Sequence, residues 1–597
     1  MPPDAPAQPV PPFTPQALEI LRARYLLRDR SGEVVEEPAD CLWRVARALA
    51  AAETRWGRVP EGQAQAFYEV LAALRFLPNS PTLMNAGKPA GQLSACFVLP
   101  IEDSLTEIFD AVKYAAVIHG TGGGTGFAFS RLRPKEDPLG TGGRASGPVS
   151  FMRVFNAATG AVNQGGVRRG ANMGVLRVDH PDVLDFVRVK RDPAELTHFN
   201  VSVAITDAFM QALAAGSDYA LVHPRTGEEL GRADAREVWD EILDSAWRTG
   251  DPGLIFIDRI NAEHPTPALG QIESTNPCGE LPLLPYESCN LGSVDVGKHV
   301  RDGAVDWDAL RATVILGVRM LDDVIEANHF PLPAIHDVTA KNRKIGLGIM
   351  GWADLLVELG VPYASQEALD LAHELMGFVL REARAASTEL ARERGAFPAW
   401  GGSRWEREGL EPLRNATVTT IAPTGTISIL AGCSSGIEPL YALSYVRRTL
   451  DGTRELTFVH PALERLARAH GFWRDDLPQR VAQNGGSLAG VPGVPPAVQT
   501  LLATAHEIPP SWHVRHQAAF QAHVENAVSK TVNLPRSATA GDVGEIYRQA
   551  YLLGCKGITV YRDGSREGQV LRTLPAEPPE AAGPSCPECS DPFGEQA

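Results

Sequence analysis

The sequence lacks several features that would define its class at once. It contains no run of about 18 apolar residues, so we expect no membrane-spanning helix. Residues 1–12 are rich in proline and lack the charged-then-apolar order of a secretion signal. Basic residues are not in excess, because the net charge is −16, which argues against a nucleic-acid-binding surface over the whole chain. We therefore expect a cytoplasmic protein with neither a membrane nor a nucleic acid as its partner.

Cysteine is also scarce, with eight residues in a chain of 597. Structural disulfides are rare in the cytoplasm, so these cysteines are expected to serve as thiols, metal ligands or catalysts. No G-x-x-x-x-G-K-[ST] motif is present, which leaves a P-loop nucleotide site unsupported. Gly140, Gly142 and Ala145 fit G-x-G-x-x-A, but the polar segment RPKEDPL before them is a poor strand, so we interpret this match as a false positive.

The first structured region predicted from the apolar pattern is helical. Residues 17–27, 42–52 and 63–74 have helical apolar spacing. They predict a small helical domain over residues 15–92, after a disordered tail at residues 1–14.

A second region, residues 93–564, alternates short apolar runs with helical stretches and glycine turns, which is typical of an α/β domain. The last residues, 565–597, are rich in proline and glutamate, so they are unable to bury a core and predict a flexible tail. This tail carries Cys586 and Cys589 in a C-x-x-C arrangement.

The segment Ser-Thr-Asn-Pro-Cys-Gly-Glu at residues 274–280 is the main candidate for chemistry. If it is extended, Asn276, Cys278 and Glu280 project to the same side, because side chains alternate along a strand. The proline fixes one φ, and the glycine permits an unusual turn. An amide, a thiol and a carboxylate would then converge at the tip of a stiffened loop. The alternative is a buried cysteine beside two polar surface residues, which is the more common arrangement for an isolated match.

Seven blocks along the chain resemble ribonucleotide reductases of the cobalamin-dependent class. They occur in the order of that family and span nearly the whole sequence. The blocks are PNSPTLMNAG at 78–87, SACFVLPIEDS at 94–104, GTGGGTGFAFSRLRP at 120–134, GGVRRGANMG at 165–174, STNPCGE at 274–280, APTGTISILAGCSSGIEP at 422–439 and GCKGITVYRDGSR at 554–566. One block would indicate little, whereas seven in the same order indicate the family strongly.

The resemblance implies a fold and a reaction. The fold is an α/β barrel of ten strands in two five-stranded halves, with residues 274–280 as a finger loop in its centre. The reaction is the reduction of ribonucleotides, expected as diphosphates, to 2′-deoxyribonucleotides by a thiyl-radical mechanism. Cys278 matches the cysteine that carries the radical, and Glu280 matches the carboxylate that takes the 3′-hydroxyl proton. Asn276 matches the amide that orients the sugar hydroxyls.

Two further cysteines, Cys96 and Cys289, match the pair that protonates the leaving 2′-hydroxyl and ends as a disulfide. They lie on separate segments, so their Cα atoms must come within about 7 Å. The alternative is two unrelated core cysteines. Cys586 and Cys589 have a spacing and an expected exposure that suit the thiol–disulfide exchange needed to reduce that disulfide. Zinc binding is the alternative for the tail, although four ligands are usual and no histidine follows His523.

A predicted strand at residues 418–421 leads into residues 423–427, where a glycine turn enters a helix. Free backbone N–H groups and the positive end of the helix dipole suit a phosphate, and the resemblance implies that this loop holds the substrate's phosphates. The alternative is an ordinary strand-to-helix turn. The substrate contacts implied by the resemblance are Ser80, Ala95, Cys96, Gly124, Asn276, Pro277, Cys278, Gly279, Glu280, Pro423, Thr424, Gly425, Thr426 and Ile427.

The resemblance implies adenosylcobalamin as the source of the radical. A reductase with a radical-generating partner would pass the radical through adjacent tyrosines, and the chain has no Tyr-Tyr pair. A glycyl-radical enzyme would carry R-V-x-G-aromatic near its end, which residues 561–565 do not fit. The D-x-H-x-x-G motif of enzymes that ligate cobalamin through histidine is absent. Relatives in this class bind cobalamin without that ligand exchange, so we expect no direct protein ligand to the metal.

The resemblance also implies partners. Residues 165–172, with Arg168 and Arg169, resemble the loop that couples a deoxynucleotide effector to the choice of base; the alternative is two solvated arginines on a glycine-rich loop. A homodimer and a thioredoxin-like reductant are implied as well. Three other functions stay open at this point: a reductase subunit that needs a separate radical-generating partner, a nucleotide-binding protein without catalysis, and a thiol oxidoreductase that uses only the tail cysteines.

Overall fold

The structure is a computed structural model that describes residues 10–89, 91–140, 142–162, 170–448 and 455–565. The chain divides into two compact units. One holds Met1–Leu440 and Ala505–Gly568, and the other holds Tyr441–Thr504 and Gln569–Ala597. Within the described ranges, no helix combines the length and the apolar character needed to cross a membrane.

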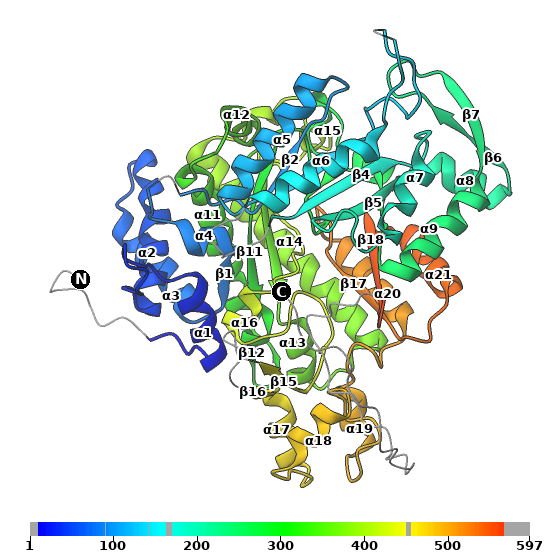
Figure 1. The fold of residues 1–597 in the computed structure, drawn as a ribbon. Coiled ribbons are helices and arrows are strands. Elements are labelled where there is room, and N and C mark those ends of the chain that lie inside the picture. Colours follow the sequence, from blue (N-terminus) through cyan, green and yellow to red (C-terminus); the bar gives the residue numbers. More distant parts are fainter. Residues whose placement is uncertain (1–9, 90, 141, 163–169, 449–454, 566–597) are drawn as a thin grey trace, which may run out of the picture. The chain divides into compact units, whose positions relative to one another are not determined.

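Three helices form the N-terminal part of the first unit (Figure 1, blue). They are α1 (Pro15–Arg24), α2 (Pro38–Ala50) and α3 (Pro60–Ala72). Each begins with a proline, whose missing N–H has no intrahelical role at the first position and whose φ already suits a helix. Helices α2 and α3 pack against each other, and Leu49, Phe67 and Leu71 on them are buried. The predicted small helical domain ahead of the barrel is confirmed.

Five parallel strands form the first half of a barrel, each paired in parallel with the next. In spatial order they are β2 (Cys96–Leu99), β3 (Gly124–Ala128), β4 (Asn172–Arg177), β5 (Phe199–Ile205) and β8 (Gly253–Phe256). Helices α5 (Leu105–Gly120), α6 (Pro148–Ala161) and α9 (Ala235–Thr249) pack on these strands around Phe127, Phe155 and Trp239. Parallel strands covered in this way are buried on both faces, which explains their continuous apolar runs.

The second half of the barrel is also parallel. Its strands are β11 (Ser288–Asp295), β14 (Ile345–Met350), β17 (Thr531–Leu534) and β18 (Gly557–Arg562). Residues 417–421 lie between β14 and β17, through the bridges Leu347–Thr419 and Ile421–Val528. The halves join where β11 runs antiparallel to β2 and β18 runs antiparallel to β8. The ring closes, and the predicted barrel of two five-stranded halves is confirmed.

The other elements of the first unit connect or cover these strands. They are β1 (Phe76–Pro78), which pairs with β11, η1 (Ala51–Trp56), α4 (Ser80–Asn85), α7 (Val183–Arg188), η2 (Val189–Arg191), α8 (Asp207–Ala215), β6 (Asp218–Val222), β7 (Glu229–Asp234), α10 (Ile257–Ala262), η3 (Pro267–Leu269), β9 (Ser274–Thr275), β10 (Pro282–Leu283), η4 (Val296–Lys298), β12 (Val300–Arg301), β13 (Ala304–Val305), α11 (Trp307–Ala327), α12 (Pro333–Asn342), α13 (Trp352–Leu359), α14 (Gln366–Arg394), η5 (Pro398–Trp400), α15 (Arg404–Arg407), α16 (Ile427–Ala431), α20 (Pro510–Gln521) and α21 (Ala540–Leu552).

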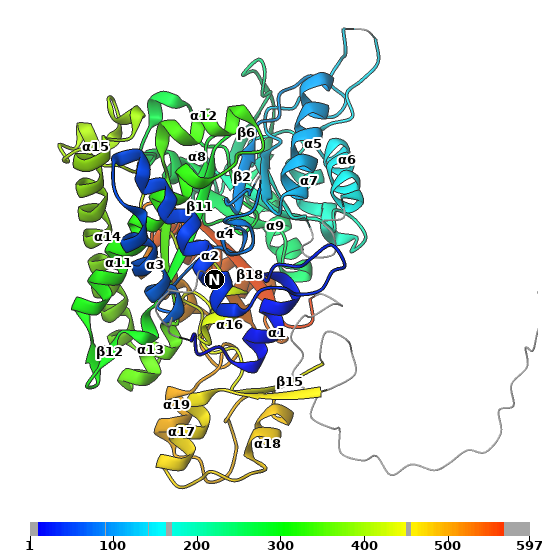
Figure 2. The same ribbon diagram turned by 90° about the vertical axis from the view of Figure 1, so that its left-hand side faces the viewer.

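The second unit contains an antiparallel strand pair and three helices (Figure 2, yellow to orange). They are β15 (Ser444–Arg448), β16 (Glu455–Val459), α17 (Pro461–Ala469), α18 (Leu477–Gln483) and α19 (Pro496–Leu501). Leu463, Ala467 and Val481 are buried. The Tyr441–Thr504 part of this unit lies within the span 93–564 that the sequence pattern joins into one domain, because no change of composition marks its ends. The domain boundaries stay a prediction.

Candidate functional site

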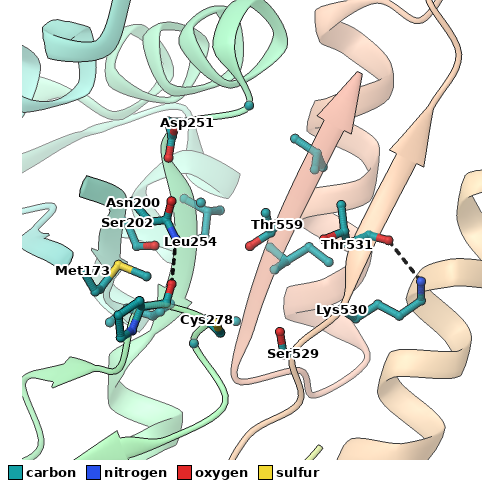
Figure 3. A pocket seen from close by; sticks show the side chains of 18 of the residues that line it. Met173, Asn200, Ser202, Asp251, Leu254, Cys278, Ser529, Lys530, Thr531 and Thr559 are labelled. Atoms are coloured by element: carbon teal, nitrogen blue, oxygen red, sulfur yellow. Dashed lines mark hydrogen bonds between the residues drawn. The ribbon is translucent and has the colours of Figure 1, made fainter. Parts of the chain in front are cut away.

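Strands β9 and β10 form a short antiparallel hairpin whose tip carries the candidate thiol. Glycines on β3 make room for it: a Cβ at Gly126 would stand 1.8 Å from the carbonyl oxygen of Thr275, and a Cβ at Gly124 would stand 3.0 Å from the Pro277 ring. The side-chain amide of Asn200 on β5 donates to the carbonyl oxygen of Pro277 at 2.8 Å (Figure 3). The finger is thus fixed to the wall of the first half-barrel.

The tip of the hairpin is a turn, so the extended arrangement expected for residues 274–280 is wrong beyond Thr275. The N–H of Gly279 donates to the carbonyl oxygen of Asn276 at 3.1 Å, and Gly279 has a φ of +82°, which glycine adopts without strain. Asn276 and Glu280 are buried, whereas Cys278 is exposed at the wall of a cavity. The amide and the carboxylate are therefore held inside the protein, while the thiol between them is presented at the cavity.

Glu280 is fixed through its backbone. Its carbonyl oxygen accepts the N–H of Ala527 at 2.9 Å and the hydroxyl of Thr420 at 3.0 Å. Both partners belong to the second half-barrel, so the returning side of the finger is tied to that half. The finger therefore contacts both halves of the barrel.

Cys96 and Cys289 stand directly opposite each other on the antiparallel strands β2 and β11. Opposed residues of such a pair have Cα atoms about 4.5–5.5 Å apart and side chains on one face, which is within the reach of a disulfide. Both cysteines are reduced and buried, in an apolar cluster with Leu281 and Leu283 of the hairpin. The structure brings the two cysteines together beside the finger, and their redox role stays a prediction.

The two sulfurs have different partners. The Asn276 amide donates to Sγ of Cys96 at 3.0 Å, whereas the thiol of Cys289 donates to the carbonyl oxygen of Lys344 at 3.5 Å. Burial raises the pKa of Cys289; the Lys344 ammonium opposes this rise, and nearby carboxylates, Glu280 among them, add to it. Cys289 is therefore a neutral thiol near neutral pH, as a proton donor must be.

Residues 423–427 form the predicted turn into a helix, and α16 begins at the last of them. Thr424 has a φ of +53°, and its hydroxyl accepts the N–H of Gly436 at 2.8 Å. The strand expected at residues 418–421 is reduced to single bridges. Its neighbours are β14 and Val528, just before β17, and the pairing with each does not extend into a ladder.

The other predicted substrate contacts lie near this turn or near the finger. Helix α1 packs against α16, and the hydroxyl of Tyr25, just after α1, is hydrogen-bonded to that of Ser80 at the start of α4, at 2.7 Å. The N–H of Gly124, which faces the finger, donates to the carbonyl oxygen of Ala95 at 2.9 Å. The α1 region therefore contacts both α16 and Ser80, and Ala95 is bonded to the strand that faces the finger, while the substrate roles stay a prediction.

A cavity of about 350 Å³ opens beside the fingertip (Figure 3). Its walls come from β5, β8, β17 and β18 and from Pro277, Cys278 and Gly279. The polar residues on its walls are Asn200, Ser202, Asp251, Gln517, Ser529, Lys530, Thr531, Thr559 and Tyr561. The volume suits a small organic ligand. Sequence reasoning missed these residues, because a buried strand carries no signal of which side chains face a cavity.

Four predicted site residues, Arg168, Arg169, Cys586 and Cys589, lie outside the described residues. In the part of the chain that the structure does describe, no three His, Cys, Asp or Glu side chains gather as a metal-binding group.

Comparison with known proteins gives consistent matches. A family model described as "Ribonucleotide reductase, barrel domain" matches residues 94–561, and one described as "Ribonucleotide reductase, all-alpha domain" matches residues 12–91. A vitamin B12-dependent ribonucleoside-diphosphate reductase of Mycobacterium tuberculosis is 52% identical over 565 residues, which cover 94% of this chain and 81% of the relative. A protein of the same name from Thermoplasma acidophilum is 48% identical over 624 residues, covering 95% of this chain and 81% of the relative.

Among solved structures, the class Id ribonucleotide reductase alpha subunit of Actinobacillus ureae superimposes with a TM-score of 0.75 at 22% sequence identity. The match covers 92% of this chain and 97% of that chain. At this identity the likeness concerns the fold alone, and it agrees with the barrel and the helical N-terminal part described above.

Proposed function

Because the chain belongs to the ribonucleotide reductase family, we propose that it reduces ribonucleoside diphosphates to 2′-deoxyribonucleotides and that adenosylcobalamin starts the reaction. The observation that carries the proposal is the arrangement at the finger: the Cys278 thiol lies at a cavity, and Cys96 stands opposite Cys289 beside Asn276. The names of the relatives at about half identity support both the substrate class and the cofactor.

The cavity at Cys278 fits the nucleoside part of adenosylcobalamin. Asn200, Ser202 and Thr559 offer hydrogen bonds to a ribose or a base, and Leu254 offers an apolar surface. When bound, the cofactor supplies the radical that takes the hydrogen atom of the Cys278 thiol. The barrel strands line this cavity, so an occupant that fills it would keep water away from that sulfur.

The chain's own residues then reduce the substrate. The Cys278 sulfur radical takes the hydrogen atom from C3′, and Glu280 accepts the proton of the 3′-hydroxyl and returns it to the same oxygen at the end of the reaction. The 2′-hydroxyl leaves as water with a proton from the pair Cys96 and Cys289. This pair gives up two electrons and two protons in total and becomes a disulfide, and Cys278 returns a hydrogen atom to C3′. One ribonucleotide and one dithiol thus give one deoxyribonucleotide, one disulfide and one water.

The substrate's phosphates are proposed to bind at Ser80 and residues 423–427. The first N–H groups of helices α4 and α16 have no acceptor within their own helices, and the positive end of a helix favours an anion. The contact of α1 with α16 and the Tyr25–Ser80 hydrogen bond support a shared site.

The proposal is tested by reduction of CDP and GDP with the purified protein under anaerobic conditions. The assay contains a small dithiol and deoxynucleotide effectors, with adenosylcobalamin present or absent. We expect deoxynucleotides only when the cofactor is present. Activity that needs an added radical-generating subunit instead would overturn the cofactor assignment. A folded protein that reduces neither diphosphates nor triphosphates would overturn the reaction.

A homodimer with a bound deoxynucleotide effector is part of the proposal. Leu105, Phe109 and Val117 on α5 are exposed, and Leu105 and Phe109 lie on one face, so this helix offers apolar surface that a second copy would cover. Arg168 and Arg169 are proposed to bind the effector. Sedimentation with and without a deoxynucleoside triphosphate measures the mass of the protein and the nucleotide that sediments with it. We expect the mass of a dimer and bound nucleotide. A monomer that binds none would contradict both statements.

The tail cysteines, Cys586 and Cys589, are proposed to carry electrons from a thioredoxin-like protein to the buried disulfide, in a reducing compartment such as the cytoplasm. With both replaced by serine, activity should change little with dithiothreitol and fall at least about tenfold with thioredoxin, because only a small dithiol reaches the disulfide directly. Equal activity with the two reductants would show that the tail is not needed.

A further inference from the structure

Lys344 lies beside the redox pair, at the start of the strand that runs parallel to β11. Cys96 on β2 is opposite Cys289 on β11, and Asn290 on β11 is opposite Ile345 on β14. Lys344 comes directly before Ile345, the first residue of β14, and its carbonyl oxygen lies 3.5 Å from Sγ of Cys289. Lys344 is therefore a cationic neighbour of the pair.

Lys344 is held in a buried ion pair. Its ammonium donates to the Glu287 carboxylate at 2.8 Å, and neither side chain is more than 1% exposed. The same carboxylate accepts the Asn342 amide and the N–H of Leu284, which fix it in place. A buried ion pair is often no more stabilising than an apolar pair of the same volume. The stability of the fold alone therefore gives no reason for a charge at this position.

We propose that Lys344 is a positioning residue for the redox pair: its ammonium stabilises the sulfur of Cys289 as a leaving thiolate when an external dithiol reduces the Cys96–Cys289 disulfide. The inference rests on the proposed function, because it requires that the pair is oxidised during turnover. Burial raises the pKa of Cys289 and so works against a thiolate; Lys344 lowers this pKa by more than its partner Glu287 raises it.

The step is a thiol–disulfide exchange. A thiolate of the external dithiol attacks Sγ of Cys96, which is 6% exposed against 1% for Cys289. A bond forms between the reductant sulfur and Cys96, and the bond to Cys289 breaks. Its electron pair goes to the Cys289 sulfur, which then takes up a proton. The second thiol of the reductant releases Cys96, so the reductant ends as a disulfide and the pair ends as two thiols.

The test follows reduction of the disulfide by dithiothreitol after oxidation with diamide. The parent protein is the full chain with Cys586 and Cys589 replaced by serine, so that dithiothreitol is the only reductant. Alkylation and peptide mass analysis count free Cys96 and Cys289 over time. The variant Lys344→Met/Glu287→Gln replaces the ion pair by a neutral pair. We expect it to be reduced roughly threefold more slowly, because Lys344 lowers the pKa of Cys289 more than Glu287 raises it, and a lower pKa speeds departure.

Two variants are controls. Lys344→Arg keeps the charge and should be reduced at nearly the parent rate. Lys556→Met removes another buried lysine, which lies just before β18 and pairs with Glu263. The disulfide of this variant should also be reduced at the parent rate.

Equal rates in the double variant and the parent would overturn the inference. So would an equally slow Lys556→Met, because the cause would then be a weakened fold. The assay contains neither nucleotide nor cofactor, so it can fail while ribonucleotide reduction succeeds. If diamide forms no disulfide between Cys96 and Cys289 in the parent, this inference falls together with the redox role in the proposed function.

Discussion

Replacing Cys278 by serine should abolish nucleotide reduction. We expect kcat to fall by at least about 10⁴-fold, which corresponds to about 5.5 kcal/mol in the barrier. The reason is that an alcohol O–H bond is too strong to relay a hydrogen atom to and from the ribose carbon. Because the side chain is exposed at a cavity and serine has nearly the same shape, the hairpin and the nucleotide sites should persist. Product formation in the anaerobic assay and nucleotide binding by equilibrium dialysis measure the two effects separately.

Cys41→Ala is the matched control for this prediction. Cys41 is a buried thiol on α2, with its sulfur 4.0 Å from the carbonyl oxygen of Leu83, and it has no part in the proposed chemistry. Turnover should stay within about twofold of the wild type, since removing a small buried group far from the reacting atoms affects stability before chemistry. A Cys278→Ser protein that keeps one hundredth of the wild-type activity would rule out the thiyl mechanism.

The barrel strands could be predicted from the sequence because parallel strands covered by helices are buried on both faces. Residues 200–205 and 253–257 therefore appear as short, continuous apolar runs, and both contain barrel strands, β5 and β8. The residue identities at the finger could be predicted from the family resemblance. The juxtaposition of Cys96 and Cys289 was only implied, because it depends on the register of two strands far apart in the sequence.

The conformation of the fingertip could not be predicted in the same way. An Asn-Pro-Cys-Gly-Glu segment is compatible with an extended strand and with a turn, and the choice is made by contacts such as Asn200 with Pro277 and Ala527 with Glu280. The cavity and Lys344 were missed for a related reason. Which side of a buried strand faces a ligand, and which distant residue lies beside a cysteine, are set by tertiary register and leave no local pattern.

Arg394 stands at the centre of a buried group of charges that the sequence did not indicate. Its guanidinium donates to Asp322 at 2.8 Å, to Asp323 at 2.7 Å and to Glu53 at 2.7 Å, and it lies 4.0 Å from the ring centroid of Trp56. Glu53 and Trp56 belong to η1 in the N-terminal part, and the two aspartates belong to α11. Arg394, the last residue of α14, therefore ties the N-terminal helices to the outer helices of the barrel.

Replacing Arg394 by methionine should lower the free energy of unfolding by about 3–5 kcal/mol, because buried carboxylates lose their cation. Burial already raises the pKa of Asp323 well above its usual range, and Arg394 is the cation that opposes this. In the variant that pKa rises further above its unfolded value. The loss of stability should therefore be largest at high pH and should shrink as pH falls and the carboxylate takes up a proton. Urea unfolding followed by tryptophan fluorescence at pH 5 and pH 8 measures the size of the stability loss and the sign of its change with pH.

Arg392→Met, two positions earlier on α14, is the control that distinguishes the loss of a buried cation from the loss of an exposed one. Arg392 is exposed and pairs with Glu389 and Glu411, so its loss should change the free energy of unfolding by less than about 1 kcal/mol. A loss in Arg394→Met no larger than in this control would contradict the prediction. Asp322 would then be held well enough by Arg343 and Arg414, which also pair with it, and the N-terminal helices would be anchored by their apolar contacts instead.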